Sequence, residues 1–465
     1  MVQTSVAFQT SDGALQKIYD RAEEIERGNI AVMDGRRVLI EGSIYRNIWI
    51  ETQPMGGEMY AKRDMDVAYN NQYLFLKYQR ADGRFPGVLR RHPEGTEAVF
   101  SHLQGLSFPY HALNLYDWMR DENQDYLNLL YDAFSRYDSY LWRTRDTDGD
   151  GCLELFTLFD TGEDHSSRFP DTEKLYWGSD EPPYGHGLLP YESMDMMGYS
   201  YDTRVMLADV SALLRNGQER LWREKANAVR QRVREYLWRE DRGACYDRDC
   251  NNHFMDTLIH NNLRAMYHGL FYPDMAERFV REHLLNPEEF WTPMPLPSIA
   301  ANDPLFRNIR GNNWSGAPEG LTYQRAIRAL EQYGFYRILT AVGLKLLEAV
   351  KRSGVFTQQY DPWTMEPTGD GDEYGPTALS VLEYIARFYG VTPVRNRLIW
   401  GALGGNRTDY IQYWGKDAYH ITCQDNRAEA FINGHTIFSV PAGYRVETTL
   451  TGGILKIDPI AVKIS

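Results

Sequence analysis

The feature that most constrains the fold is a helical spacing of apolar residues that continues through most of the chain and ends near residue 390. Between Leu15 and Tyr389, apolar side chains recur every three or four residues, for example from Tyr126 to Leu141. This spacing predicts roughly eleven or twelve helices in pairs, joined by longer loops rich in Pro, Gly, Trp and Asp. Because no internal repeat accompanies the pairs, we predict a mainly α fold, an (α/α)6 toroid (barrel), rather than an open solenoid.

The pattern changes after Val391. Short segments of alternating polar and apolar residues follow, and Asn433-Gly434 has the chemistry of a tight hairpin turn. We therefore predict a helical domain over residues 1–392 and a small antiparallel β domain over residues 393–465. A short β-hairpin is also expected near residues 30–42, around Asp34-Gly35.

The charge balance limits the partners that the protein can have. The 465 residues include 64 acidic and 50 basic side chains, which gives a net charge of −14. No run of Lys and Arg is present to replace phosphate counterions, so we expect neither a nucleic acid nor an anionic membrane as partner. A spanning apolar segment and a leader sequence are also absent, so a cytoplasmic protein is expected. The oligomeric state is left open.

The cysteines indicate neither a disulfide framework nor a metal centre. There are four of them, and they are scattered. Cys245 and Cys250 are five residues apart without a matching His or Cys pair, so a zinc site is not expected. No cofactor is indicated.

The segment Asp160–Phe169, with the sequence DTGEDHSSRF, carries the densest group of reactive side chains. Three carboxylates, one imidazole and one guanidinium lie in ten residues with almost no apolar periodicity. Crowded carboxylates cost electrostatic energy unless they are solvated, bind a cation or do chemistry, and a raised carboxyl pKa suits an acid catalyst. The segment is therefore either a candidate site of acid catalysis or a solvated acidic loop.

A second acidic segment precedes it. Asp146-Thr147-Asp148-Gly149-Asp150-Gly151 resembles the start of a calcium loop, with Leu153 at the usual apolar eighth position. The twelfth position, where an EF-hand has a bidentate Glu, is Thr157. The segment is therefore either a weak calcium site or a turn held by Asp side chains, and the sequence leaves both readings open.

Several short motifs rich in Gly, Pro, Trp and charged residues follow one another along the helical part. In chain order they are Pro54-Met55-Gly56-Gly57, Asp82-Gly83-Arg84-Phe85-Pro86-Gly87, Leu103-Gln104-Gly105, Arg145–Gly151, Asp160–Phe169, Asn313-Trp314-Ser315-Gly316, Tyr360-Asp361-Pro362 and Tyr374-Gly375-Pro376-Thr377. In this order they resemble the motifs of one group of enzymes, the inverting glycosidases that include α,α-trehalases and processing α-glucosidases (glycoside hydrolase families 37 and 63). The resemblance covers nearly the whole helical part, and the fold that it implies is the toroid.

The resemblance implies that Asp164 is the general acid. The neighbouring residues point the same way, because the like charges of Glu163 and Asp160 would hold a proton on Asp164. His165 and Arg168 would position the acid or bind sugar hydroxyls. The alternative is that Asp164 structures the loop through a hydrogen bond to the backbone.

The chain departs from the family at the general base. The Glu that activates water stands two residues before the Tyr of Tyr-Asp-Pro, and Gln358 occupies that position here. An amide cannot accept the proton, so the second carboxylate of an inverting site must come from another loop. We favour Glu319, which replaces a substrate-facing Trp of the family, and next Glu373. Two further candidates on the same loop as Gln358 are Glu366 and Asp370.

The substrate-binding candidates lie on the matching loops. Trp314 is either a platform for a sugar ring or a core residue, and Asp195 is either another acidic family position or a helix N-terminal charge. The predicted binding residues are Arg63, Asp66, Gln104, Arg168, Trp314, Gln358 and Tyr360.

These features together predict an inverting, exo-acting glycoside hydrolase for a disaccharide, small oligosaccharide or small glycoside. The resemblance favours an α-linkage and implies no cofactor and no metal. Two alternatives remain at this point. With Gln358 in the base position the protein could bind carbohydrate without hydrolysing it, or the same toroid could carry an epimerase or a lyase.

Overall fold

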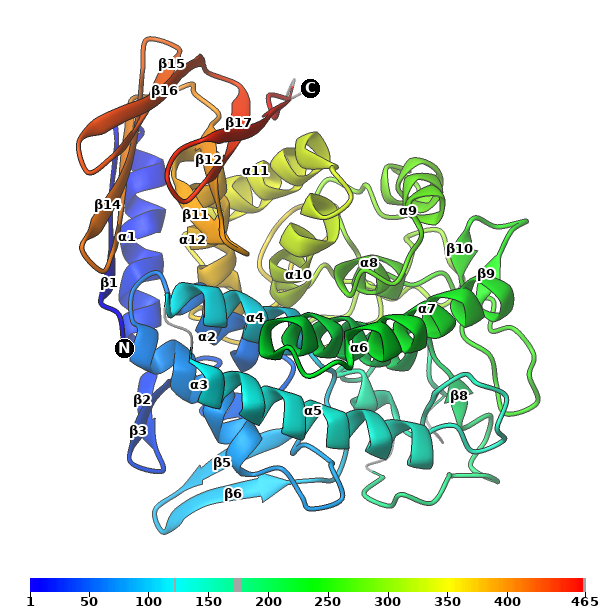
Figure 1. The fold of residues 1–465 in the computed structure, drawn as a ribbon. Coiled ribbons are helices and arrows are strands. Elements are labelled where there is room, and N and C mark those ends of the chain that lie inside the picture. The colour runs from blue at the N-terminus through cyan, green and yellow to red at the C-terminus, as the bar shows by residue number, and fades with distance from the viewer. Residues whose placement is uncertain (121–122, 171–176, 463–465) are drawn as a thin grey trace.

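The computed structural model describes residues 1–120, 123–170 and 177–462. Twelve α-helices lie in this part of the chain (Figure 1). They are α1 (Gly13–Gly28), α2 (Gln53–Tyr60), α3 (Met65–Lys77), α4 (Pro109–Trp118), α5 (Gln124–Thr144), α6 (Met194–Leu214), α7 (Glu219–Tyr236), α8 (Asn261–Tyr267), α9 (Pro273–Phe279), α10 (Gly320–Glu331), α11 (Tyr336–Ser353) and α12 (Gly375–Tyr389).

The even-numbered helices contact one another in sequence. α2 contacts α4, and the contacts continue through α6, α8 and α10 to α12, which contacts α2 again. Odd-numbered helices lie against this set, with α1 on α12, α3 on α2 and α7 on α6. A helix-rich body is therefore confirmed, and every second helix belongs to one ring of contacts.

The long helix α5 shows why the apolar spacing predicted helices. Its N-terminus is capped by Asn123, whose side-chain oxygen accepts a hydrogen bond of 3.1 Å from the Tyr126 backbone amide. Leu130, Phe134 and Tyr137 then bury one face, at the spacing that an amphipathic helix requires.

The C-terminal region is antiparallel, as predicted. A five-stranded sheet has the order β1-β13-β14-β15-β16, and a four-stranded sheet has the order β11-β12-β17-β18. Asn433-Gly434 forms the turn between β15 and β16. The strands are β1 (Thr4–Thr10), β11 (Val391–Val394), β12 (Arg397–Ala402), β13 (Thr408–Trp414), β14 (Asp417–Gln424), β15 (Arg427–Ile432), β16 (His435–Pro441), β17 (Tyr444–Thr449) and β18 (Ile454–Pro459).

The first strand of the chain belongs to this C-terminal sheet. β1 pairs with β13 along its whole length, from Thr4 opposite Trp414 to Thr10 opposite Thr408. Both sheets lie beside α12, which contacts β11, β12, β13 and β14 (Figure 1). The two ends of the chain are thereby joined to the same side of the helical body.

Short strands lie in the loops of the helical body. The pair β2 and β3 turns at Asp34-Gly35, and β4, β5 and β6 form a small sheet before α4. Their bounds, with those of the remaining short strands, are β2 (Ile30–Met33), β3 (Arg36–Leu39), β4 (Ile48–Trp49), β5 (Val88–His92), β6 (Gly95–Val99), β7 (Glu154–Leu155), β8 (Tyr191–Glu192), β9 (Trp238–Arg239) and β10 (Ala244–Cys245).

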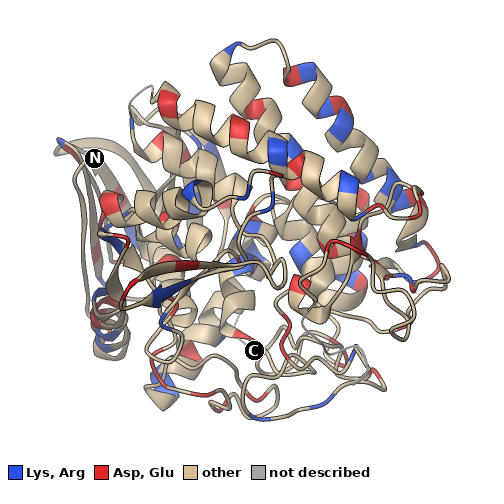
Figure 2. Ribbon diagram, turned by 90° about the horizontal axis from the view of Figure 1, so that it is seen from below, with Lys and Arg blue, Asp and Glu red and all other residues tan. Residues whose placement is uncertain are grey.

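Charges of both signs are distributed over the helices. Figure 2 shows blue and red positions interspersed along them when the molecule is seen from below. Among the described residues, no helix is long and apolar enough to cross a lipid bilayer.

A buried ion pair stabilises the segment that carries the candidate acid. Arg145, at the end of α5, donates a hydrogen bond of 2.7 Å to the Asp160 carboxylate, and neither side chain is exposed. The backbone amides of Leu103 and Phe156 also donate to Asp160. Burial alone would raise the pKa of Asp160, but the Arg145 charge and these hydrogen bonds lower it overall.

We expect Asp160→Asn to lower the free energy of unfolding by about 3–5 kcal/mol, because it leaves the Arg145 guanidinium buried without a counter-charge. Urea unfolding measures the change. The matched control is Asp132→Asn on α5, an exposed carboxylate paired with the half-buried Arg136, and there the loss should be about 0.2–1 kcal/mol. Equal losses in the two variants would contradict a special role for the buried pair.

Candidate active site

A pocket bounded by loops contains Asp164. Its walls come from segments far apart in the sequence, before α2, before α4, after β7 and before α10 and α12. The lining residues are Glu41, Tyr45, Trp49, Glu51, Arg90, His102, Gln104, Phe159, Gly162, Asp164, Asn312, Trp314, Leu321, Gln358 and Tyr374. Two larger hollows lie along β1, but they contain none of these residues.

Loop contacts fix Asp164 in the pocket wall. Its backbone oxygen accepts a hydrogen bond of 3.0 Å from the Trp314 amide, and the next carbonyl, that of His165, accepts one from the Ser315 hydroxyl. The Asp164 carboxylate accepts a hydrogen bond of 2.6 Å from the Asn312 amide group. These hydrogen bonds therefore hold the segment Asp160–Phe169 against the Asn312–Ser315 loop at the position of the candidate acid.

The proton on Asp164 is favoured by burial. Desolvation raises the pKa of this carboxyl, while the hydrogen bond from Asn312 and the charge of His165 act in the opposite direction. The like-charge explanation made from sequence is wrong in its cause, because both neighbouring carboxylates are neutralised by cations. Asp160 pairs with Arg145, and Glu163 contacts Arg168 at 3.0 Å and Arg264 at 3.7 Å.

Two further carboxylates line the pocket. Glu41 accepts a hydrogen bond of 2.8 Å from the Tyr374 hydroxyl, and burial raises its pKa to about 8, with further contributions from the charges of Glu51 and Asp164. Glu51 accepts hydrogen bonds from Arg325 at 2.8 Å and from Gln104 at 3.1 Å. The pocket thus combines a carboxyl that readily holds a proton with a carboxylate bound to a cation.

The backbone at Gly162 allows Glu51 to come close to the acid segment. Gly162 has a φ of +75°, and a Cβ at this position would lie 2.2 Å from a Glu51 carboxylate oxygen. Only glycine fits there without displacing the carboxylate.

Glu319 is buried beside the pocket rather than among its lining residues. It has no exposed surface, and neither carboxylate oxygen has a hydrogen-bond partner among the described residues. Burial raises its pKa well above the usual range, and the charges of Asp164 and Glu51 raise it further. Although it immediately precedes α10, its side chain does not cap that helix.

Gln358 is linked to the candidate acid by a chain of hydrogen bonds. Its side-chain amide donates to Asn312 at 3.0 Å, and Asn312 donates in turn to Asp164. The Tyr45 hydroxyl donates to the Gln358 side-chain oxygen at 2.8 Å. Gln358, which stands where glycosidases of families 37 and 63 have the general base, therefore does face this pocket, although its amide carries no charge.

The other predicted residues separate into two groups. Gln104 and Trp314 line the pocket together with Gln358. Arg168 and Tyr360 are buried outside the lining, where Arg168 pairs with Glu163 and Tyr360 packs against Tyr323.

Arg63, Asp66 and Glu373 are not brought to the pocket. Arg63 pairs with Glu23, and Asp66 is largely exposed near the first residue of the chain. Glu373 pairs with Arg21 on α1. Short matching motifs brought these positions into the prediction, but a motif does not determine the direction of each side chain.

Sequence reasoning missed several pocket residues. Glu41, Tyr45, Trp49 and Glu51 all lie between β3 and α2, in a segment without helical spacing and without a recognised motif. The one available signal is local. Two glutamates there lie shortly before Pro54-Met55-Gly56-Gly57, the first motif of the resemblance.

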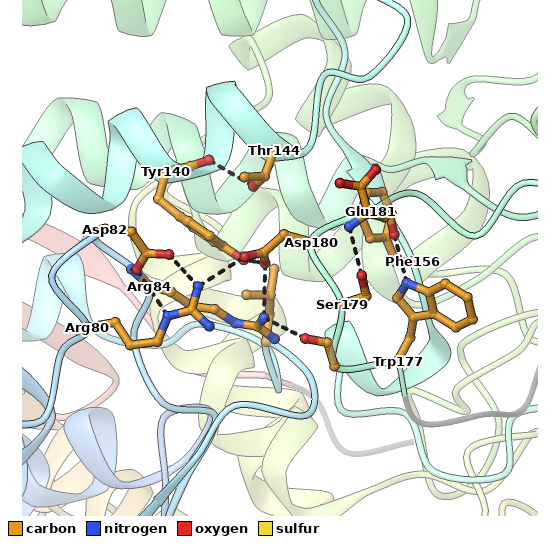
Figure 3. A network of polar contacts seen from close by, with 12 residues as sticks. Arg80, Asp82, Arg84, Tyr140, Thr144, Phe156, Trp177, Ser179, Asp180 and Glu181 are labelled. Carbon is orange, nitrogen blue, oxygen red and sulfur yellow. Dashed lines mark hydrogen bonds and ion pairs between the residues drawn. The ribbon is translucent and has the colours of Figure 1, made fainter.

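The Asp82–Gly87 loop contributes to structure rather than to the pocket lining. Asp180 accepts hydrogen bonds from Tyr140 at 2.6 Å, Arg80 at 3.0 Å and Arg84 at 3.1 Å (Figure 3). Burial would raise the pKa of Asp180, but these hydrogen bonds and the two arginine charges lower it. The network joins this loop to α5 and to the segment around residues 177–181.

The aspartate-rich loop brings together groups that could hold a cation. One ligand oxygen from each of Asp146, Asp148 and Asp150 lies within 4.8 Å of the others, and Asp148 is equally close to Glu154 and Glu192. Glu192 is 3% exposed, and its Oε2 has no hydrogen-bond partner in the described part of the chain. Carboxylate oxygens at this density suit calcium better than softer metals.

We expect calcium to raise the midpoint of thermal unfolding by several degrees, because an ion that binds only the folded state stabilises it. Differential scanning calorimetry with calcium or with a chelator measures the shift. Asp148→Asn should remove the shift, whereas Asp274→Asn, which changes an exposed carboxylate on α9, should preserve it. Identical melting with calcium and with chelator would show that the loop is a turn only.

Carboxyls in a loop-lined pocket, carried by a ring of helices, are the arrangement that a glycoside hydrolase of the helical type requires. Residues 53–376 match the family model of the mannosylglycerate hydrolase MGH1-like glycoside hydrolase domain. The chain belongs to this family and is a glycosidase. The resemblance to families 37 and 63 is confirmed, with this chain as a divergent member.

Solved structures share the fold at low sequence identity. The GH63 mannosylglycerate hydrolase of Thermus thermophilus superposes with a TM-score of 0.66 at 16% identity, over 80% of this chain and 100% of that one. The neutral trehalase of Saccharomyces cerevisiae superposes with a TM-score of 0.55 at 14% identity, over 78% of this chain and 80% of that one. The α-L-rhamnosidase of Dictyoglumus thermophilum superposes with a TM-score of 0.60 at 14% identity, over 95% of this chain and 45% of that one. The curated protein sequences contain no match.

Proposed function

We propose that this glycosidase is exo-acting and hydrolyses a disaccharide, a small oligosaccharide or a small glycoside, with an α-linkage favoured. The names of two structural relatives, a mannosylglycerate hydrolase and a trehalase, refer to small glycosides. A pocket built from several separate loops, rather than an open groove, suits the end of a chain or a small molecule.

We also propose that the helices form an (α/α)6 toroid. The ring of contacts from α2 through α12 and back to α2 supports this, with the odd-numbered helices as the outer layer. In this proposal the β domain begins with β11 (Val391–Val394), close to the predicted boundary between residues 392 and 393, and β1 is an N-terminal addition to the β domain.

Asp164 is the general acid in this proposal. The observation that carries the proposal is a carboxyl whose pKa is raised by burial and which lies in the pocket wall. A protonated carboxyl can donate to the glycosidic oxygen as the bond to the anomeric carbon breaks. Asn312 orients the group through its hydrogen bond.

Glu319 is the proposed general base. Inversion needs a second carboxylate about 6.5–9.5 Å from the acid, so that a water molecule fits between that carboxylate and the anomeric carbon. Glu319 makes no hydrogen bond in the described structure and caps no helix, which supports this role. The role also requires the Glu319 side chain to reach the pocket from behind its lining and to lose the proton that burial favours. Gln104, Trp314 and Gln358 are the proposed sugar contacts in the pocket wall.

The test is a panel of α- and β-linked disaccharides and glycosides, with the anomer of the first sugar released followed by NMR in the first minutes. We expect hydrolysis of an α-linked substrate and release of the β-anomer. Release of the α-anomer would overturn the inverting mechanism, and cleavage within long chains would overturn exo-action.

A further inference from the structure

A second pocket lies between the helical body and the C-terminal sheets. It has a volume of about 330 Å³ and takes its walls from the end of α10, the start of α11, the turn between β11 and β12, and β17. Figure 1 shows α11 next to β12 and β17 on this side of the molecule. The lining residues are Tyr110, Arg328, Glu331, Gln332, Tyr336, Val394, Arg395, Arg397, Ile399, Arg445 and Glu447.

This pocket is far from the proposed active site. Helix α10 begins next to Glu319 and ends at Glu331, in the wall of the second pocket. At a rise of about 1.5 Å per residue, this helix separates the two places by roughly 18 Å. None of the residues that line the active-site pocket lines this one.

Four arginines and two glutamates line the pocket, in a chain whose net charge is −14. Each of the four arginines already contacts a carboxylate, and Arg445 also lies 3.7 Å from Asp458. Arg328 donates to Asp202 at 2.9 and 3.0 Å, Arg395 contacts Asp117 at 2.9 Å, and Glu447 accepts from both Arg397 and Arg445. These contacts hold the guanidinium groups in place around the cavity.

Arg445 retains an unused donor, as do Arg328 and Arg395 at the same atom. Arg445 is 6% exposed, and its Nε has no hydrogen-bond partner in the parts of the chain that the structure describes. The guanidinium lies 4.4 Å from the centre of the Tyr336 ring, which fixes its plane. An unpaired N–H on a buried guanidinium is costly, so a ligand that accepts its hydrogen bond would gain free energy.

The N-terminus of α11 adds a second source of positive charge to this pocket. Tyr336, its first residue, lines the pocket, and the helix has neither a side-chain cap nor an acidic residue in its first turn. The free amide groups and the positive end of the helix dipole favour an anion at such a terminus. The N-terminus of α11 and the arginines of the pocket therefore both favour a negatively charged ligand.

We propose that this pocket binds a small phosphorylated ligand, with the phosphate held by Arg445, Arg397 and the start of α11. Guanidinium groups match phosphate oxygens in pairs, and the rings of Tyr110 and Tyr336 provide apolar surface for the rest of the molecule. The volume suits a ligand the size of a sugar phosphate. Bound there, the ligand would join α10 and α11 to the β domain.

Isothermal titration calorimetry of the full chain with glucose 6-phosphate, inorganic phosphate and glucose tests the proposal. We expect both phosphates to bind and glucose not to bind at this site. Arg397→Gln changes a half-exposed side chain and should fold normally, and it should weaken phosphate binding by about tenfold, the effect of one charge-assisted hydrogen bond. Arg445→Gln should weaken it at least as much.

The matched control is Arg337→Gln, which removes an equal charge from the first turn of α11 at a position outside the pocket lining. Its phosphate affinity should equal that of the wild type. Three results would overturn the proposal, namely no phosphate binding, equal weakening by Arg337→Gln, and affinities unchanged in both pocket variants. Because phosphate binding requires no hydrolysis, failure here and failure of the proposed activity are distinguishable.

Discussion

Asp164→Asn is expected to lower kcat by at least about 100-fold on substrates with a sugar or alkyl leaving group, because the variant cannot protonate the departing oxygen. The side chain keeps its size, and its oxygen can still accept the hydrogen bond from Asn312. KM should therefore change much less than kcat. Steady-state kinetics on the substrate identified in the disaccharide panel measures both constants.

Two comparisons separate this chemical role from a structural one. A glycosyl fluoride needs no proton on its leaving group, so Asp164→Asn should retain much of its activity on that substrate. In the wild type, activity should fall as pH rises through the pKa of Asp164, which burial raises, and this alkaline limb should be absent from the variant. Asp132→Asn, at an exposed position on α5, should resemble the wild type. Equal losses on fluoride and on natural glycosides would rule out the acid role.

The helical body could be predicted because its signal is local. Apolar residues at three- and four-residue spacing produced α5 and α7 where the pattern placed them, since burying one face determines a helix over its whole length. The C-terminal hairpin around Asn433-Gly434 was predictable for the same reason. The pairing of β1 with β13 was not, because its partner lies at the opposite end of the sequence and no local pattern specifies a strand's partner.

The site was predictable only where a motif and a pocket coincide. Asp164, Gln104, Trp314 and Gln358 line one pocket, because each lies on a loop at the same end of the helical body. Arg63, on a matching motif, instead faces α1, since two neighbouring residues on one loop can point in opposite directions. Pocket carboxylates such as Glu41 follow a strand without any distinctive spacing.

The cause of the raised pKa of Asp164 could not be read from sequence either. The sequence shows that Asp160 and Glu163 are close neighbours but not that Arg145 pairs with Asp160 or that Arg168 and Arg264 neutralise Glu163. Arg145 is 15 residues from Asp160, and Arg264 lies much further from Glu163 in the sequence. The expected rise in the pKa of Asp164 is therefore found, but burial causes it and the neighbouring charges do not.

Glu319→Gln is expected to reduce activity and to stabilise the protein, a combination that a purely structural residue would not show. A carboxylate without partners is costly to bury, and the folded protein raises its pKa, so the folded state holds the proton more tightly than the unfolded chain. Above the ordinary pKa of Glu, about 4.3, this group lowers stability increasingly with pH until the folded pKa is reached. At pH 7 the variant should therefore unfold at a higher urea concentration than the wild type, with a free energy of unfolding larger by about 1–3 kcal/mol. At pH 4 the two proteins should have the same free energy of unfolding.

The loss of activity follows from the chemistry of the base. An amide cannot accept a proton from the attacking water, so kcat should fall by about 100-fold or more. The charge of Asp164 raises the pKa of Glu319, so the two carboxyls titrate as a pair, and the proposed roles require the form in which Asp164 holds the single proton. Adding Gln358→Glu to the variant should restore part of the activity, since that position is linked through Asn312 to the acid. Glu373→Gln, which breaks a contact with Arg21, should remain active, and a loss there together with full activity in Glu319→Gln would transfer the role of base to Glu373.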